Sequence, residues 1–188
     1  MYHAGNKLID PDLLFQTVGL QGGMHTAVFG TGRTGHIVFP AARIVGENGI
    51  VYAVDIMRDI LKIIQKRAAD ENIPQVHTVW SDLEQAGKTA IPKASLDIVF
   101  LVNILLFVTN REAVLTEAMR LTKPYGRILV VDWARIGLPF CPPKERFVNF
   151  VALKQWALKN NLTIEEEFSA GKYHAGVVLT KSPEHSST

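Results

Sequence analysis

Cysteine is nearly absent from this chain, because Cys141 is the only one among its 188 residues. A single cysteine excludes an internal disulfide and fits a reducing compartment. It has no partner at the spacing of a zinc site, and the six histidines are scattered along the chain. We therefore expect neither a disulfide framework nor a metal site.

The chain also lacks an excess of charge of one sign and a long apolar run. Its 20 Lys and Arg against 18 Asp and Glu give a net charge of +2, which provides no reason to expect a nucleic acid or a membrane as a partner. The most apolar stretch, residues 98–108, is interrupted by Asn103 and is much shorter than the roughly 20 residues that span a bilayer. The first residues show no signal-peptide pattern, so we expect a cytoplasmic protein.

Apolar strands alternate with helices over the first 130 residues or so, the pattern of a doubly wound parallel sheet. We expect strands at residues 26–29, 50–54, 76–80, 96–102 and 127–131, and helices at 35–45, 56–72 and 111–121. Thr109 and Glu112 predict a capping box for the last of these helices, which Pro124 is expected to stop.

The rhythm changes near the C-terminus. A helix at 150–159 is followed by strands at 163–168 and 176–181, and a linker this short predicts an antiparallel hairpin. The length favours one domain, residues 1–181, followed by a Ser-rich tail, 182–188, that we expect to be disordered.

A glycine-rich turn, Gly30-Thr31-Gly32-Arg33-Thr34-Gly35, separates the first strand from the first helix. Glycines let the backbone approach a ligand closely, and a helix N-terminus offers unpaired N–H groups. The second strand ends on Asp55, whose carboxylate can accept both hydroxyl protons of a ribose. The pattern predicts a nucleotide-binding half-site without specifying which adenosine compound binds.

In this order of elements, the residues at the strand ends resemble those of class I S-adenosylmethionine-dependent methyltransferases, in particular small bacterial proteins similar to the ubiquinone/menaquinone-type C-methyltransferases. The resemblance is carried by the glycine turn, Val54-Asp55-Ile56, Ser81-Asp82-Leu83, residues 96–99 leading to Asn103, residues 121–129, and Gly171-Lys172-Tyr173-His174. It implies an α/β fold: a Rossmann-like, doubly wound, seven-stranded mixed sheet with a C-terminal antiparallel hairpin. It also implies S-adenosyl-L-methionine as cofactor and a small-molecule acceptor.

The resemblance implies a role for each matching residue. Gly30, Thr31, Gly32, Arg33, Thr34 and Gly35 would contact the methionine part of the cofactor, and Asp55 would hold the ribose. Asp82, with Ser81 beside it, would accept from the adenine amino group, while Ile56 and Leu83 would sandwich the ring. Helix or turn capping is the alternative role for Asp55 and Asp82. Residues 1–22 would form a segment on the substrate side.

Methyl transfer from a sulfonium needs alignment more than a protein nucleophile. The candidate catalytic residues are therefore Asn103, at the end of the fourth strand, and Asp132, at the end of the fifth. Asp132, His36 and His174 are the candidates for a general base, although an ordinary loop role is the competing interpretation for both histidines.

The sequence departs from the family pattern in two places: the glycine turn reads Gly-Thr-Gly-Arg-Thr-Gly in place of the shorter Gly-x-Gly-x-Gly, and the residues before it are apolar. Val28 and Phe29 stand where class I enzymes usually carry an acidic residue before the glycines. Two alternatives therefore stay open: a non-catalytic methyltransferase-like binding module, and an NAD-dependent oxidoreductase that uses the Gly30-x-Gly32-x-x-Gly35 pattern with Asp55. The sequence does not distinguish a monomer from a homodimer.

Overall fold

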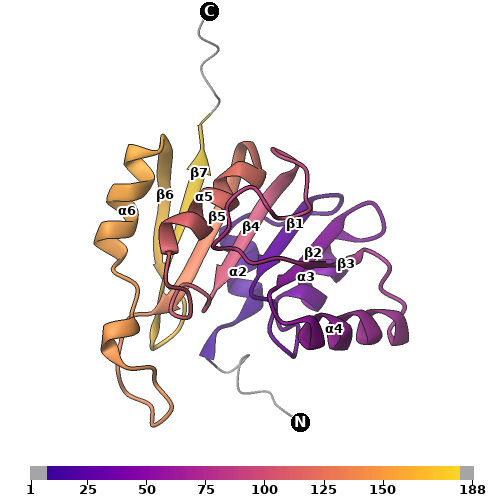
Figure 1. Ribbon diagram of the computed structural model, residues 1–188, viewed down its shortest axis with the longest axis horizontal. Helices are drawn as coiled ribbons and strands as arrows, with labels where there is room; N and C mark the ends of the chain where they lie inside the picture. The colour runs from indigo at the N-terminus through magenta and orange to yellow at the C-terminus, as the bar shows by residue number, and fades with distance from the viewer. Residues whose placement is uncertain (1–7, 183–188) are drawn as a thin grey trace, which may run out of the picture.

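The computed structural model describes residues 8–182, so the expected disordered tail lies almost entirely outside the described residues, as does the start of the segment 1–22 (Figure 1). The strands are β1 (His25–Phe29), β2 (Ile50–Asp55), β3 (Val76–Trp80), β4 (Leu96–Val102), β5 (Thr122–Trp133), β6 (Leu162–Ser169) and β7 (His174–Lys181). The helices are α2 (Pro11–Thr17), α3 (Val38–Val45), α4 (Arg58–Asp70), α5 (Arg111–Leu121) and α6 (Phe150–Lys159), with a 3-10 turn, η1 (Lys144–Arg146).

The strands form one seven-stranded sheet in the order β3-β2-β1-β4-β5-β7-β6. The first five strands pair in parallel, whereas β7 pairs antiparallel with both β5 and β6. This confirms the predicted doubly wound mixed sheet with its terminal hairpin. The strand order reverses between β1 and β4, which is where open α/β sheets bind ligands beyond their carboxyl ends.

Helices cover both faces of the sheet (Figure 1). Along β5, Leu129 and Val131 belong to the core that includes buried residues of α2, α3 and α4. The alternate residues Ile128 and Val130 belong to the core formed with α5 and α6. The side on which a β5 residue falls therefore depends on whether its position is odd or even, because successive side chains point to opposite faces.

The fifth strand is longer than predicted. Strand β5 begins at Thr122, directly after α5, and includes Pro124, which has no N–H to donate. Its pairing with β4 shifts register between Leu96 and Ile98, and Tyr125 has a positive φ of 62°. The irregular start accommodates the proline.

The predicted capping box was wrong in detail. Asn110 is the N-cap of α5, and its side chain accepts from the backbone N–H of Ala113 at 3.1 Å. The backbone N–H groups of Thr109 and Asn110 both donate to the Glu84 carboxylate, which holds the residues just before the helix. The cap therefore follows a long-range contact that the local pattern does not contain.

Candidate functional site

A cavity of about 550 Å³ lies where the chain leaves β1, β2 and β4 at the carboxyl edge of the sheet. Its lining comes from four segments: Leu8 and Ile9; Val28, Gly30, Thr31, Gly32, Thr34, His36 and Ile37; Asp55, Ile56, Met57 and Ile60; and Val102, Asn103, Ile104 and Phe107. Most of these side chains are apolar. The cavity occupies the position that the strand-order reversal predicts.

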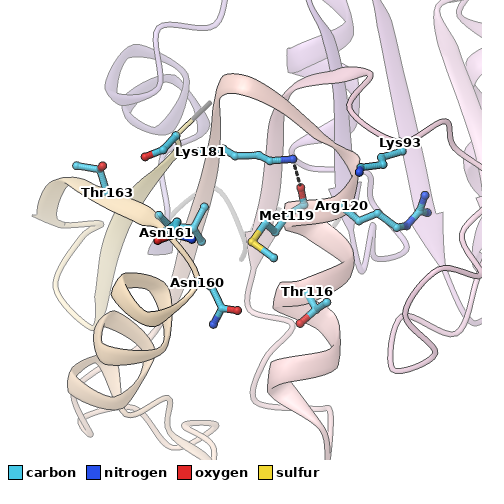
Figure 2. Close-up of a pocket in the computed structure, with 10 residues that line it drawn as sticks. Lys93, Thr116, Met119, Arg120, Asn160, Asn161, Thr163 and Lys181 are labelled. Carbon is cyan, nitrogen blue, oxygen red and sulfur yellow. Dashed lines mark hydrogen bonds between the residues drawn. The ribbon is translucent and has the colours of Figure 1, made fainter. Parts of the chain in front are cut away.

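A larger hollow of about 880 Å³ lies at the opposite end of the sheet, beside the C-terminal turn of α5 (Figure 2). Its cations already contact the protein. The Lys181 ammonium donates to the carbonyl oxygens of Met119 and Thr122, at 3.1 and 3.0 Å, and Arg120 pairs with Glu117. This hollow contains none of the predicted site residues.

Two glycines of the turn line the cavity, and both have a positive φ: 69° for Gly30 and 64° for Gly32. A Cβ on Gly30 would lie 2.5 Å from the Ile104 Cδ1 atom, whereas a Cβ on Gly32 would meet nothing within 4 Å. Gly30 is therefore needed for close packing on the loop after β4. Gly32 leaves its backbone open toward the cavity.

Gly35 and Arg33 do not line the cavity. A Cβ on Gly35 would lie 2.5 Å from the Phe39 ring, so this glycine allows α3 to pack closely. The Arg33 side chain is exposed. The helix predicted from Gly35 begins only at Val38, and most of residues 31–37 lie in turns.

Asp55 lies at the end of β2 and is only 7% exposed. Its carboxylate accepts from the backbone N–H of Met57 at 2.9 Å and from that of Gly32 at 3.4 Å. The first contact is the turn-capping role considered from the sequence. The second connects β2 to the glycine turn, and the ribose role of Asp55 stays a prediction.

Three buried polar atoms that line the cavity have no hydrogen-bond partner in the described chain: Thr31 Oγ1, His36 Nε2 and Asn103 Oδ1. Most buried polar atoms in proteins do have one, so these three atoms suit a polar ligand. Burial lowers the pKa of His36, which keeps its imidazole neutral at neutral pH. Asn103 has a positive φ of 53°.

Several predicted cofactor residues lie outside the cavity lining. The Ser81 hydroxyl bonds to that of Thr89 at 2.9 Å, and Leu83 is buried in the core on the α5 side. The Asp82 carboxylate accepts from the backbone N–H of Glu84 and the side chain of Gln85. Of the residues predicted to contact adenine, only Ile56, which is 57% exposed, lines the cavity.

Asp132 does not reach the cavity either. It is fully buried on the α5 face, and its Oδ1 atom accepts from the backbone N–H of Trp133 at 2.8 Å. Burial raises its pKa to about 6, against the opposing effects of the N–H groups of Trp133, Leu106 and Leu105 and of the Arg111 charge. This geometry supports a structural role beneath the loop after β4 and does not support the predicted role as general base.

His174 pairs with Trp133 across β5 and β7, with ring centroids 4.5 Å apart, so it lies on the face of the sheet opposite to Asp132. It is 2% exposed, and burial lowers its pKa to about 4. His174 and Tyr173 are not part of the cavity lining. Of the three candidate bases, only His36 lines the cavity.

The sequence interpretation missed six lining residues: Ile37, Met57, Ile60, Val102, Ile104 and Phe107. Phe107 is 69% exposed, and together with Ile56 and Met57 it leaves apolar surface along the cavity. Its closeness to Asn103 in the sequence was an available signal, because the loop after a switch-point strand borders the ligand site.

Residues 8–182 contain no group of three or more His, Cys, Asp or Glu arranged to hold a metal ion. In the same part of the chain, no helix has both the length and the apolar character needed to cross a bilayer.

The comparisons with known proteins agree with the fold. A family model described as a methyltransferase domain matches residues 23–173. The ubiquinone/menaquinone biosynthesis C-methyltransferase of Ectopseudomonas mendocina is 34% identical over 109 residues, 57% of this chain and 41% of that protein. The enzyme of the same name from Azotobacter vinelandii is 32% identical over 105 residues, 55% of this chain and 40% of that protein. The chain thus spans about two-fifths of the length of these relatives.

Among solved structures, an S-adenosylmethionine-dependent methyltransferase from Aquifex aeolicus superposes with a TM-score of 0.85 at 22% identity, over 95% of this chain and 93% of that one. This similarity concerns the fold, and the family model covers most of the chain. The chain therefore belongs to the methyltransferase domain family and has the class I methyltransferase fold.

Proposed function

We propose that S-adenosylmethionine binds in the cavity at the carboxyl edge of the sheet. Asp55 holds the ribose hydroxyls, and the backbone of Gly30, Thr31 and Gly32 borders the methionine part. Asn103 lies beside the methyl group that is transferred. The observation that carries this assignment is the contact of Gly32 with Asp55 at 3.4 Å, in a cavity that also contains partnerless buried polar atoms.

The cofactor's ammonium group needs hydrogen-bond acceptors, and Val28 and Phe29 provide no side-chain oxygen at the end of β1. Two buried oxygens on the cavity wall have no partner in the described chain, Thr31 Oγ1 and Asn103 Oδ1. We propose that these neutral oxygens replace the usual carboxylate. In this arrangement the ammonium group of the cofactor is bound although no acidic side chain stands at the end of β1.

We propose a small, largely apolar acceptor, because Leu8, Ile9, Ile37, Ile60 and Phe107 all line the cavity. The names of the relatives suggest a quinone precursor, whose ring would fit such a lining. The matched region covers only about two-fifths of these relatives, so their activity does not transfer directly to this chain and the quinone precursor is part of the proposal.

When bound, S-adenosylmethionine would supply a methyl group on a positively charged sulfur, so that a bond from the acceptor to the methyl carbon would form as the carbon–sulfur bond breaks and S-adenosylhomocysteine leaves. Alignment of the two reactants provides most of the acceleration that a protein needs to contribute. His36 is neutral and has an unpartnered Nε2 atom in the cavity, so it can accept a proton from an acidic acceptor. Asn103 orients the methyl group through its amide.

Calorimetric titration with S-adenosylmethionine, S-adenosylhomocysteine and NAD tests the cofactor assignment. We expect the first two to bind, and Asp55→Ala to weaken S-adenosylhomocysteine binding at least about tenfold, since a hydrogen bond to a charged group is lost. Asp59→Ala is the matched control, because Asp59 is an exposed acid four residues further on, with 82% of its side chain accessible.

Each other outcome contradicts part of the proposal. Binding of NAD alone would establish an oxidoreductase-type site, and failure of all three to bind would favour a non-catalytic module. Equal affinities of Asp55→Ala and Asp59→Ala would remove the ribose assignment. The acceptor is tested separately, by transfer of labelled methyl groups to hydroquinones and catechols. We expect the wild-type rate to rise with pH as His36 loses its proton, and this rise to be absent in His36→Phe.

A further inference from the structure

The connection between β5 and α6, residues 134–149, extends beyond the end of the sheet (Figure 1). Its tip, residues 136–140, reads Ile-Gly-Leu-Pro-Phe and carries no charge. Ile136 is 64% exposed and Phe140 is 63% exposed. Such large apolar side chains, projecting together from a loop, are unusual on a surface that contacts only water.

The tip is held together as a compact turn. The backbone N–H of Cys141 donates to the Leu138 carbonyl at 3.0 Å, and the Cys141 sulfur lies 3.9 Å from the Arg135 carbonyl oxygen. The two ends of the tip are therefore close to each other. Ile136 comes directly after Arg135 and Phe140 directly before Cys141, so both side chains belong to one small protrusion.

Cations surround this protrusion. Arg135, Lys144 and Arg146 are all exposed, and no ion pair involves them in the part of the chain that the structure describes. Glu145 is the only acid among residues 134–149. This short segment therefore holds a local charge of +2, equal to the net charge of the whole chain.

A second loop adds to this charge. The backbone N–H groups of Ala134 and Arg135 both donate to the Tyr173 carbonyl, at 2.9 and 3.1 Å, so the turn between β6 and β7 lies against the base of the protrusion. That turn carries the exposed Lys172. Four cations and one acid thus surround an apolar tip.

We propose that residues 134–149, together with Lys172, dock the protein on an anionic phospholipid surface. Ile136 and Phe140 enter the boundary between headgroups and acyl chains, and the four cations contact the headgroup phosphates, which is how interfacial segments bind. The balanced charge of the whole sequence gave no reason to expect a membrane. The four cations and the two apolar side chains come together on one exposed surface only in the folded chain.

A second copy of the chain fits this surface less well. A two-fold contact between copies would place the same patch on both sides and bring four cations against four cations. An anionic bilayer instead complements both the charge and the apolar tip. The proposal does not depend on the identity of the methyl acceptor.

Co-sedimentation with phosphatidylcholine vesicles, prepared with and without phosphatidylglycerol, tests the proposal. We expect binding only to the vesicles that contain phosphatidylglycerol, and release by high salt. The triple variant Arg135→Gln/Lys144→Gln/Arg146→Gln is expected to weaken binding on the order of 100-fold, since each cation near an anionic surface contributes a factor of about five.

The double variant Ile136→Ser/Phe140→Ser tests the apolar tip, and we expect it to weaken binding more than about tenfold. Its matched control is Val151→Ser/Leu158→Ser, which removes two side chains of equal exposure, 62% and 60%, from α6. The control pair should bind vesicles like the wild type. All three variants should retain the wild-type melting temperature and S-adenosylhomocysteine affinity, so that a loss of vesicle binding is not a loss of folding.

Cys141 provides a direct probe of insertion, because it is the only cysteine and lies on the protrusion. An environment-sensitive fluorophore attached to it should shift to shorter wavelength with anionic vesicles, and this shift should disappear in Ile136→Ser/Phe140→Ser. Absence of anionic-lipid binding, or equal losses in the two double variants, would overturn the proposal. Sedimentation velocity that shows self-association of the wild type, abolished by Ile136→Ser/Phe140→Ser, would identify a contact between copies instead.

Discussion

The backbone N–H of Gly32 points at the Asp55 carboxylate, with 3.4 Å between the nitrogen and Oδ2. The two residues are separated by a helix in the sequence and meet because β1 and β2 are parallel neighbours whose carboxyl ends lie at one edge. The contact holds the open backbone of the glycine turn beside the acid proposed to bind the ribose. In variants of the residues around this contact, stability and cofactor affinity are therefore expected to change by different amounts.

Gly32→Ala should affect cofactor binding more than stability. Its φ of 64° is strained for alanine, but its Cβ would face open space. We expect a loss of about 1 kcal/mol of stability and a loss of S-adenosylhomocysteine affinity of at least about tenfold. Gly23→Ala is the control, since Gly23 has a φ of 80° and equally open space far from the cavity. Equal affinities in the two variants, measured by calorimetry, would show that Gly32 does not border the ligand.

Asn103→Gly should have opposite effects on stability and on binding. Glycine adopts the observed φ of 53° without strain and removes a buried oxygen that has no partner, so we expect stability to be unchanged or raised by up to about 1 kcal/mol. Affinity for S-adenosylmethionine should fall, because the proposed ammonium contact is lost. Chemical denaturation and calorimetry on the same samples measure both quantities. A fall in stability with unchanged affinity would assign Asn103 to the fold alone.

Glu117→Gln should strongly destabilise the protein. Glu117 is fully buried on α5 and accepts from Arg120 and from the backbone N–H groups of Gly87 and Thr89. Burial alone would raise its pKa, but these donors hold the pKa at about 2. Replacing the charge leaves Arg120 without its anionic partner, at a cost of about 3 kcal/mol. Glu112→Gln, at an exposed position of the same helix, should change stability by less than about 0.5 kcal/mol.

The same carboxylate predicts a pH dependence. Because its folded pKa is below the ordinary value of 4.5, its stabilising contribution is complete above that value and is lost as the pH falls toward 2. The stability difference between the wild type and Glu117→Gln, measured by denaturant unfolding, should therefore shrink over this range. A constant difference would mean that Glu117 is not ionised in the folded protein.

Asp132→Asn should reveal a pH dependence of the opposite sign. Burial raises the pKa of Asp132 from 3.8 to about 6, so its contribution is present below the ordinary value and is lost as the pH rises through 6. Asparagine does not titrate, and the wild type should lose up to about 3 kcal/mol relative to Asp132→Asn between pH 4 and pH 7. His174 titrates in the same range with the opposite sign, but it is common to both proteins and cancels in the difference.

Asp132→Asn also tests the catalytic prediction. Because the carboxylate lies outside the cavity lining, we expect the variant to bind S-adenosylhomocysteine like the wild type. Loss of binding without loss of stability would restore Asp132 to the site.

Much of the fold followed from local patterns. The bounds of β3, β4, α5 and α6 agree with those predicted, because apolar runs and flanking turn residues determine where such elements begin and end. Gly30, Gly32, Asp55 and Asn103 were predicted together, and the structure places them around one cavity. Parallel strands bring their carboxyl ends to a common edge, so residues at those ends become neighbours whatever their distance along the chain.

The direction of each side chain depended on tertiary structure. Asp132 and Trp133 are adjacent at the end of β5 and lie on opposite faces, and the sequence does not say which face carries the cavity. Asp82 instead caps its own turn, and Leu8 and Ile9, from the segment before α2, line the cavity. The protrusion at Ile136 and Phe140 depends on contacts with the β6–β7 turn. The order of helices and strands was thus determined by the sequence alone, because apolar patterns and turn residues are local signals. Which side chains line the cavity was decided by strand register and long-range packing, which only the folded chain possesses.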